Sequence, residues 1–226
     1  MESWLVAGAG TVVCGVLIAL LVMAVVVSAR KERERQQTLG RWAAQHGWHV
    51  THHPKVAWGR RMPGRNRRGV SLALSGRIGG RPVTIAEYSY TQTSTSADNR
   101  SQSSTTYRHV LMIARLARPA ATVAVFRRGA MSRFGRSLFG DRATAIGYEP
   151  FDSAYRVAAD DARLVRTVLV PQLVTEHIAG HLPDWSLEGD ELLTFRDGRI
   201  EDTATILPGF APLLRVADLI DAYSQR

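Results

Sequence analysis

The chain has 226 residues, which is enough for one membrane-spanning segment and one domain of ordinary size. Hydrophobic residues make up 45% of the chain and charged residues 22%, which excludes a disordered polypeptide. The single cysteine, Cys14, excludes an internal disulfide framework and a zinc site built on cysteines. A formal net charge of +9 favours anionic partners, chiefly phospholipid head groups or nucleic acid.

The charge is distributed unevenly along the chain. Residues 30–142 hold 22 basic and 5 acidic side chains, whereas residues 143–226 hold 7 basic and 14 acidic ones. The soluble domain, predicted over residues 48–226, is therefore divided into a basic half, 48–142, and an acidic half, 143–226. We expect the first half to contact anionic lipid and the second to be available to a protein partner.

An apolar run opens the chain. Residues 5–27 carry no charged side chain, and as a helix they extend about 35 Å, enough to cross a hydrocarbon core of about 30 Å. A cleaved signal peptide is the alternative, but no basic residue precedes Leu5 and the run is longer than the apolar part of a signal sequence. We predict a retained transmembrane anchor over residues 1–29.

Basic residues follow the predicted anchor, and Glu2 is the only charged side chain before it. Lysine and arginine favour the cytoplasmic side of a membrane. The sequence therefore predicts a single-pass protein of the cell membrane with its N-terminus outside and its domain in the cytoplasm. A charged juxtamembrane helix is predicted over residues 30–47, and its cations are Arg30, Lys31, Arg33, Arg35 and Arg41.

Small residues recur every four positions inside the apolar run. Such a stripe lets two transmembrane helices approach closely, so it predicts self-association through the anchor. The residues of this stripe are Ala7, Thr11, Gly15 and Ala19.

The first part of the domain has the pattern of an antiparallel meander. Trp48 and Val50 begin a short strand, and residues 70–90 alternate as a hairpin whose turn is Gly79-Gly80. Residues 91–106 contain ten Ser or Thr among sixteen positions, which predicts a mobile loop. Two further strands are predicted over 107–117 and 121–127, separated at Pro119.

The second part mixes strands with helices in the predicted order β-α-β-β-α. Phe151, Tyr155 and Val157 are assigned to a strand, and Asp160-Asp161 is expected to cap a helix. A further helix is predicted from Pro171 to about His181. Two short strands joined at Gly189-Asp190 follow, then a hairpin turn at Asp197-Gly198 and an amphipathic helix over 210–223. The fold class is α+β.

The chain resembles a family of uncharacterised single-pass membrane proteins of GC-rich Gram-positive bacteria, a family with a domain of unknown function. The matching stretches are the apolar run with RKERER, then RWAAQHGWHV, GRIGGRPVTIAEYSY, FDSAYRVAADDARLVRTVLVPQL and the terminal helix. The resemblance implies this topology and membrane anchoring, and it implies no activity.

The loop over residues 58–69 is the strongest candidate binding site. It contains five arginines and no acidic residue. Guanidinium groups bind lipid phosphates with two parallel hydrogen bonds, so the loop is a candidate membrane-surface site. A solvated loop and a nucleic-acid site are the alternatives, and the second lacks interleaved aromatic residues. The arginines are Arg60, Arg61, Arg65, Arg67 and Arg68. The predicted membrane-surface set also includes Arg30, Lys31, Arg33 and Arg35 of the juxtamembrane helix.

Enzyme signatures are weak. Phosphate-binding GxxxxGK[ST] and nucleophile GxSxG motifs are missing from the sequence, and no cofactor is predicted. His177 and His181 are four apart on a predicted helix and are weak metal candidates, although two solvated histidines are the plainer interpretation. A second histidine group, expected to be solvated, consists of His46, His49, His52 and His53.

A basic and apolar segment, residues 127–140, is interpreted in two ways. It either dips into lipid head groups or packs Phe134 and Phe139 into the core. Taken together, these patterns predict a membrane-anchored, non-catalytic scaffold or sensor. The alternatives are an envelope enzyme with a metal at His177 and His181, and a membrane-tethered nucleic-acid binder.

Overall fold

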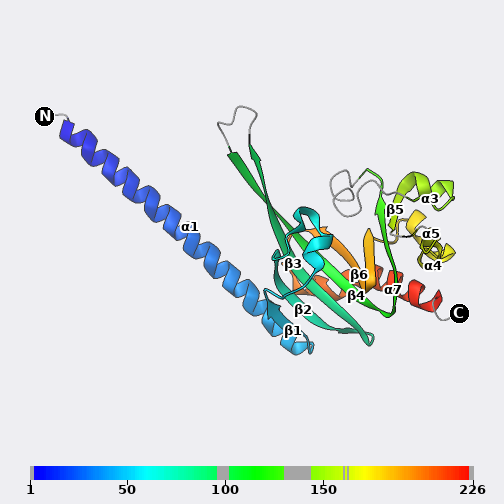
Figure 1. The fold of residues 1–226 in the computed structure, drawn as a ribbon. Coiled ribbons are helices and arrows are strands. Elements are labelled where there is room, and N and C mark those ends of the chain that lie inside the picture. Colours follow the sequence, from blue (N-terminus) through cyan, green and yellow to red (C-terminus); the bar gives the residue numbers. More distant parts are fainter. Residues whose placement is uncertain (1–2, 96–101, 130–143, 160, 162, 224–226) are drawn as a thin grey trace. The chain divides into compact units, whose positions relative to one another are not determined.

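The computed structural model describes residues 3–95, 102–129, 144–159, 161 and 163–223, without the side chains of residues 3–18. It consists of two compact units, residues 1–45 and 46–226. The first is an N-terminal helix, and the second combines an antiparallel sheet with C-terminal helices (Figure 1). The α+β fold class is confirmed.

The first unit is one continuous helix, α1 (Ser3–Gln45). It joins the apolar run to the charged stretch predicted as a juxtamembrane helix, because no proline or other breaker lies between them. Gly47 follows with a φ of 67°, a left-handed conformation that glycine adopts without strain. The helix thus ends two residues before Gly47, where the charged helix was predicted to end.

The sheet has six strands, and its first four neighbours follow the chain order β1-β2-β3-β4. The fifth and sixth strands, β5 and β6, both pair with β4. All pairs are antiparallel, as predicted for a meander. The strands are β1 (His49–His52), β2 (Val70–Ile78), β3 (Arg81–Thr95), β4 (Gln102–Arg127), β5 (Tyr155–Ala159) and β6 (Trp185–Asp197).

The hairpin between β2 and β3 has the predicted turn. Ile78 pairs with Arg81, and Gly79 and Gly80 between them have φ angles of 57° and 82°. Two successive positive φ angles define the two-residue turn that fits the twist of a hairpin.

The prediction of a mobile loop over 91–106 is wrong for the described part of that range. Thr91–Thr95 continues β3 and pairs in register with Gln102–Thr106 of β4, and Figure 1 shows these strand ends reaching beyond the other strands. Hydroxyl pairs cross the ladder, with Oγ1 atoms of Thr91 and Thr106 3.1 Å apart. Threonine favours strands, and such cross-strand pairs stabilise them. Residues 96–101 lie outside the described residues.

Two predicted strand breaks are also wrong. β4 runs through Pro119 as one strand, with register shifts against β6 between Arg115 and Val123 that accommodate the proline. β6 likewise runs through Gly189, so the two short strands predicted there are one. The turn at Gly198 ends β6 but starts no hairpin, because a helix follows.

Helices separate β5 and β6, as predicted, but a helix also precedes β5 and β6 is one strand, so the C-terminal half differs from the predicted order. Phe151 lies in the helix α3 (Glu149–Ala154) and not in a strand, whereas Tyr155 and Val157 lie in β5 as predicted. Asp161 accepts hydrogen bonds from the backbone just before α4 (Val165–Val168). Pro171 begins α5 (Pro171–Ile178), as predicted.

The chain ends in η3 (Thr203–Thr205), α6 (Ile206–Gly209) and the amphipathic helix α7 (Ala211–Tyr223), which packs against β4 and β6. Among the described residues, Thr203–Tyr223 has the length and composition of a membrane span, but 39% of its apolar window is buried in the fold. The apolar side chains of α7 that face the sheet include Leu213, Val216 and Ile220. This burial is typical of a core helix.

Candidate anion-binding groove

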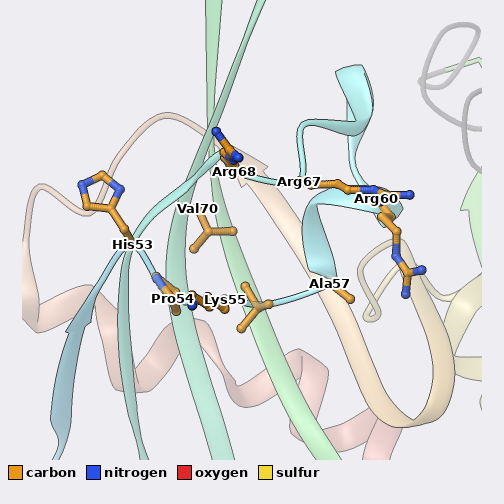
Figure 2. Close-up of a pocket in the computed structure, with 9 residues that line it drawn as sticks. His53, Pro54, Lys55, Ala57, Arg60, Arg67, Arg68 and Val70 are labelled. Atoms are coloured by element: carbon orange, nitrogen blue, oxygen red, sulfur yellow. The ribbon is translucent and has the colours of Figure 1, made fainter.

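A groove of about 660 Å³ lies beside the segment that joins β1 to β2 (Figure 2). Its apolar floor includes Val56 and Ala57. Nine residues line it, and none of them is acidic: His53, Pro54, Lys55, Val56, Ala57, Arg60, Arg67, Arg68 and Val70. In the view of Figure 2, the side chains of Arg60 and Arg67 extend toward one end of the groove and His53 lies at the other. The groove thus combines a cationic rim with an apolar floor.

Two short 3₁₀ turns, η1 (Trp58–Arg61) and η2 (Pro63–Arg65), form most of the predicted basic loop. In a 3₁₀ turn, side chains three positions apart lie on the same side. Trp58 and Arg61 therefore both point inward, whereas Arg60 between them is exposed. The loop is consequently a folded segment with an inner and an outer side.

The inner side of η1 is attached to β6. The Trp58 indole Nε1 donates to Glu191 Oε2 at 2.9 Å, and the Arg61 guanidinium donates to Ser186 Oγ and the Glu191 carbonyl at 2.9 and 3.1 Å. Burial lowers the pKa of Arg61, opposed by nearby Glu188 and Glu191. Arg61 was predicted to contact the membrane surface. Its 8% exposure and its bonds to β6 remove it from that set.

Tyr88 holds the second turn. Its hydroxyl donates to the Pro63 carbonyl at 2.5 Å and accepts from the Asn66 backbone N–H at 3.0 Å. Burial raises the pKa of Tyr88, so the phenol remains a donor. The Asn66 side chain in turn donates to the Ser89 carbonyl and accepts from the Arg68 N–H. These bonds fix the backbone that carries the outward arginines.

Gly59 allows the two ends of the loop to touch. A Cβ atom built on Gly59 would lie 2.1 Å from the carbonyl oxygen of Asn66, which no side chain permits. Gly64 has a φ of 72° and lies against the ring of Tyr90. The glycines in this loop therefore serve close packing, and the loop also buries Trp58 and Met62 on one face of the sheet.

The other arginines of the loop are exposed. Among the described residues, the structure gives no carboxylate partner to the side chains of Lys55, Arg60, Arg67 and Arg68. Arg65 is also exposed, at a φ of 47°, but does not line the groove. Composition thus identified the arginines. Lys55 and the apolar floor, formed by Pro54, Val56 and Ala57, were missed because these residues resemble an ordinary connection.

The juxtamembrane cations lie on α1. Arg30, Lys31 and Arg33 are exposed, and Arg35 is half-buried and paired with Glu32 at 2.8 Å. The small-residue stripe Ala7, Thr11, Gly15 and Ala19 is helical, but the side chains of its first three members lie outside the described residues.

His177 and His181 are not brought together. His177 is fully buried in α5, and its Nε2 accepts a hydrogen bond from Trp185 Nε1 at 2.9 Å. His181 lies beyond the end of the helix, after Gly180 at a φ of 75°, and is exposed. No group of three metal-binding side chains exists among the described residues. The expectation that both are solvated is wrong for His177. The four histidines of the second predicted group, His46, His49, His52 and His53, are exposed, as expected.

A second buried histidine lies where β3, β4 and β6 meet. His109 Nδ1 is 2.8 Å from Asp197 Oδ1, and the ring packs against both Tyr88 and Tyr90. Burial lowers the pKa of His109, although Asp197 opposes the change. The ring of Phe195 meets the His109 imidazole edge-on, so aromatic rings surround this pair.

Ion pairs connect the two charge halves of the domain. Arg81 contacts both Asp218 and Asp221 of α7 at 2.9 and 2.7 Å, and Arg115 contacts Asp190 and Glu191 of β6. Several carboxylates of the acidic half are therefore neutralised by arginines of the basic half.

The basic segment 127–140 is described only to residue 129, where Arg128 donates to backbone carbonyls of Asp152 and Tyr155. Its remainder lies outside the described residues.

No protein-family model and no curated protein matches the sequence. Among solved structures, the crystal structure of the mycobacterial trehalose monomycolate transport factor A, TtfA, is similar at 12% sequence identity with a TM-score of 0.49. The match covers 84% of this chain and 92% of that one.

Proposed function

We propose that this chain is a single-pass membrane protein whose cytoplasmic domain is a non-catalytic scaffold or sensor, docked on anionic lipid through its basic loop. The observation that carries the proposal is the groove. Four cationic side chains without a carboxylate partner among the described residues surround it, and they stand on a backbone held by Arg61 and Tyr88. A fixed backbone loses little conformational entropy when the side chains that it carries bind phosphate groups.

Exposed apolar side chains on α1 support the membrane anchor. From Leu20 to Val27 the large hydrophobic residues are 41–67% exposed. An apolar belt of this kind on a helix is stable in a bilayer and unfavourable in water. The C-terminal helical stretch offers no such belt, since its apolar face is buried in the domain.

The positive charge of the domain and the length of the helix that follows the apolar run both support docking on the anionic leaflet. Each cation close to an anionic leaflet contributes about 1 kcal/mol. The helix continues for about 24 Å from Arg30 to Gln45, while a domain of this size has a radius of gyration of about 16 Å. The boundary between the two units lies at Gln45–His46, and Gly47 follows at a φ of 67°. We propose that tilting of the helix in the membrane, or bending of the chain near this glycine, brings the domain to the leaflet. Exposed carboxylates such as Glu149 and Asp202 remain for a protein partner.

The other candidate functions have less support. A metal-dependent envelope enzyme requires His177 and His181 to converge, and one is buried and the other exposed. A nucleic-acid binder requires stacking surfaces, and the groove lining contains no Phe, Tyr or Trp.

Docking is tested with residues 30–226 and vesicle flotation. Replacing both Arg67 and Arg68 by alanine is expected to lower binding to anionic vesicles about thirtyfold, since two cations contribute about 2 kcal/mol. Arg196→Ala, an exposed arginine on β6, is the matched control and should change binding severalfold less. Equal binding of the unchanged protein to neutral and anionic vesicles would contradict the proposal.

Topology is tested in intact cells with a membrane-impermeant maleimide. An engineered cysteine at the exposed Gln92 of β3 is expected to react only after lysis, because the domain is proposed to be cytoplasmic. Ser3→Cys at the start of α1 should react without lysis and serves as the control. Labelling of Gln92→Cys in intact cells would refute the orientation.

A further inference from the structure

We infer that the groove beside residues 53–70 binds a single anionic phospholipid, with the phosphate on the arginine rim and the start of an acyl chain on the floor. This inference rests on the proposed function and names the ligand class of the same site. It differs from docking on a charged surface, which needs no apolar floor.

The rim fits a phosphate group. Arg60, Arg67 and Arg68 each present a planar guanidinium that can donate two parallel hydrogen bonds to phosphate oxygens. Lys55 adds a fourth positive charge as a point donor. No carboxylate lines the groove, so an anion there meets no opposing charge from the lining.

The floor fits hydrocarbon. Val56 is half-buried and packs on the core cluster that contains Trp58 and Val70, while Ala57 is exposed. Pro54 continues the floor and has no backbone N–H that would need a partner. A hydrophilic anion such as inorganic phosphate would leave this apolar surface in water, whereas an acyl chain would cover it.

The volume suits one molecule. About 660 Å³ lies within the range of sites for individual small ligands, and it is open along one side. An open groove holds the head group and the first part of a chain, and the rest of the lipid stays in a bilayer or micelle. Nucleic acid fits less well, since the described lining contains no Phe, Tyr or Trp on which a base could stack.

The test uses the full chain in nonionic detergent micelles with dioctanoyl phosphatidylglycerol as the probe. The readout is amide hydrogen exchange in peptides covering residues 53–70, because the transmembrane helix also attracts lipid. The lipid is expected to slow exchange there, whereas dioctanoyl phosphatidylcholine and sodium phosphate at equal concentrations are not. Protection by either of these two to the same extent would overturn the inference.

Two kinds of variant distinguish the binding of a single lipid and its acyl chain from electrostatic attraction to a charged surface. Val56→Gln keeps every charge and makes the floor polar, so the half-saturating lipid concentration is expected to rise about tenfold. Ala57→Gln is a second such variant at an exposed position, where folding is not affected. Arg67→Ala with Arg68→Ala should raise the concentration about thirtyfold, and Arg196→Ala should leave it unchanged.

The outcomes distinguish this inference from the proposed function. If both floor variants bind the lipid as the unchanged protein does while the arginine variant is weakened, the groove is only a charged surface. The inference then fails, and docking on anionic lipid stands. If the arginine variant also binds unchanged, both fail. Protection of 53–70 by a nucleic-acid duplex but not by lipid would overturn both in favour of a nucleic-acid site.

Discussion

Replacing Arg61 by alanine is expected to lower the free energy of unfolding by about 3–5 kcal/mol, the range for breaking a buried charged interaction. The guanidinium is 8% exposed and donates to two backbone carbonyls and one hydroxyl of β6. Without it, the carbonyls of Ser186 and Glu191 lose a donor in a buried site, and the volume of the side chain is left empty. The loss should appear as a lower urea midpoint in equilibrium unfolding of the domain.

Arg60→Ala is the matched control for this prediction. It removes the same chemical group from the neighbouring position of the same turn, but Arg60 is exposed, and the change should stay within about 0.5 kcal/mol. Similar midpoints for the two variants would show that η1 is not attached to β6 through Arg61. Because that attachment supports the groove, lipid binding would then have to be explained without a fixed rim.

The sequence correctly predicted those elements that are determined by residues close to one another in the chain. The Gly79-Gly80 turn, the helix beginning at Pro171 and the amphipathic period of α7 each depend on neighbouring residues, and each is present. The strand ends at 91–95 and 102–106 depend on a partner across the ladder. Their Ser and Thr side chains are compatible with a solvated loop and with cross-strand hydroxyl pairs alike, and composition does not distinguish the two.

In the candidate site too, some features follow from neighbouring residues and others depend on residues far away in the sequence. Its arginines are visible as a cluster without acids, but the burial of Arg61 depends on the phase of a 3₁₀ turn and on Glu191, which lies on a strand 130 residues later. One signal was available in the sequence. Trp58 and Arg61 are three apart, and a large aromatic residue at that spacing indicates which arginine of an adjacent pair points inward.

Charge counted along the chain was also an incomplete guide to charge in space. The basic and acidic halves are adjacent in the fold, and Arg81 bound to Asp218 and Asp221 joins β3 to α7. What remains available to an anionic partner is the set of cations that folding leaves unpaired among the described residues. Four of these cations, Lys55, Arg60, Arg67 and Arg68, line the groove, so the candidate site is narrower than the basic half.

The domain is expected to lose stability as the pH falls from about 6.5 to 4, and His177 causes a defined part of that loss. Burial, with a smaller contribution from Arg127, lowers the pKa of His177 to about 4. In the unfolded chain the imidazole has a pKa of about 6.5, so the unfolded state binds more protons in this interval. Stability is therefore complete above pH 6.5 and declines below it, by up to about 3 kcal/mol from this residue.

Protonation is opposed by the surroundings of the ring. Nε2 already accepts a hydrogen bond from the Trp185 N–H, and the rings of Phe151 and Tyr155 contact the imidazole. A proton on Nε2 would remove this hydrogen bond, and these contacts supply no carboxylate to which the charged ring could donate instead. Nδ1 is buried and has no hydrogen-bond partner among the described residues. The neutral ring is consequently the form that the fold requires.

His177→Gln isolates this contribution from the carboxylates that titrate in the same range, among them Glu176, whose pKa a hydrogen bond from Arg215 lowers. The amide oxygen can still accept from Trp185, but the side chain does not titrate. Urea unfolding at pH 7 and 4.5 should show that the variant loses about 2–3 kcal/mol less than the unchanged protein over this interval. If both proteins lose the same amount, His177 is not held neutral by the fold, and the packing of α5 against β6 at Trp185 has to be reconsidered.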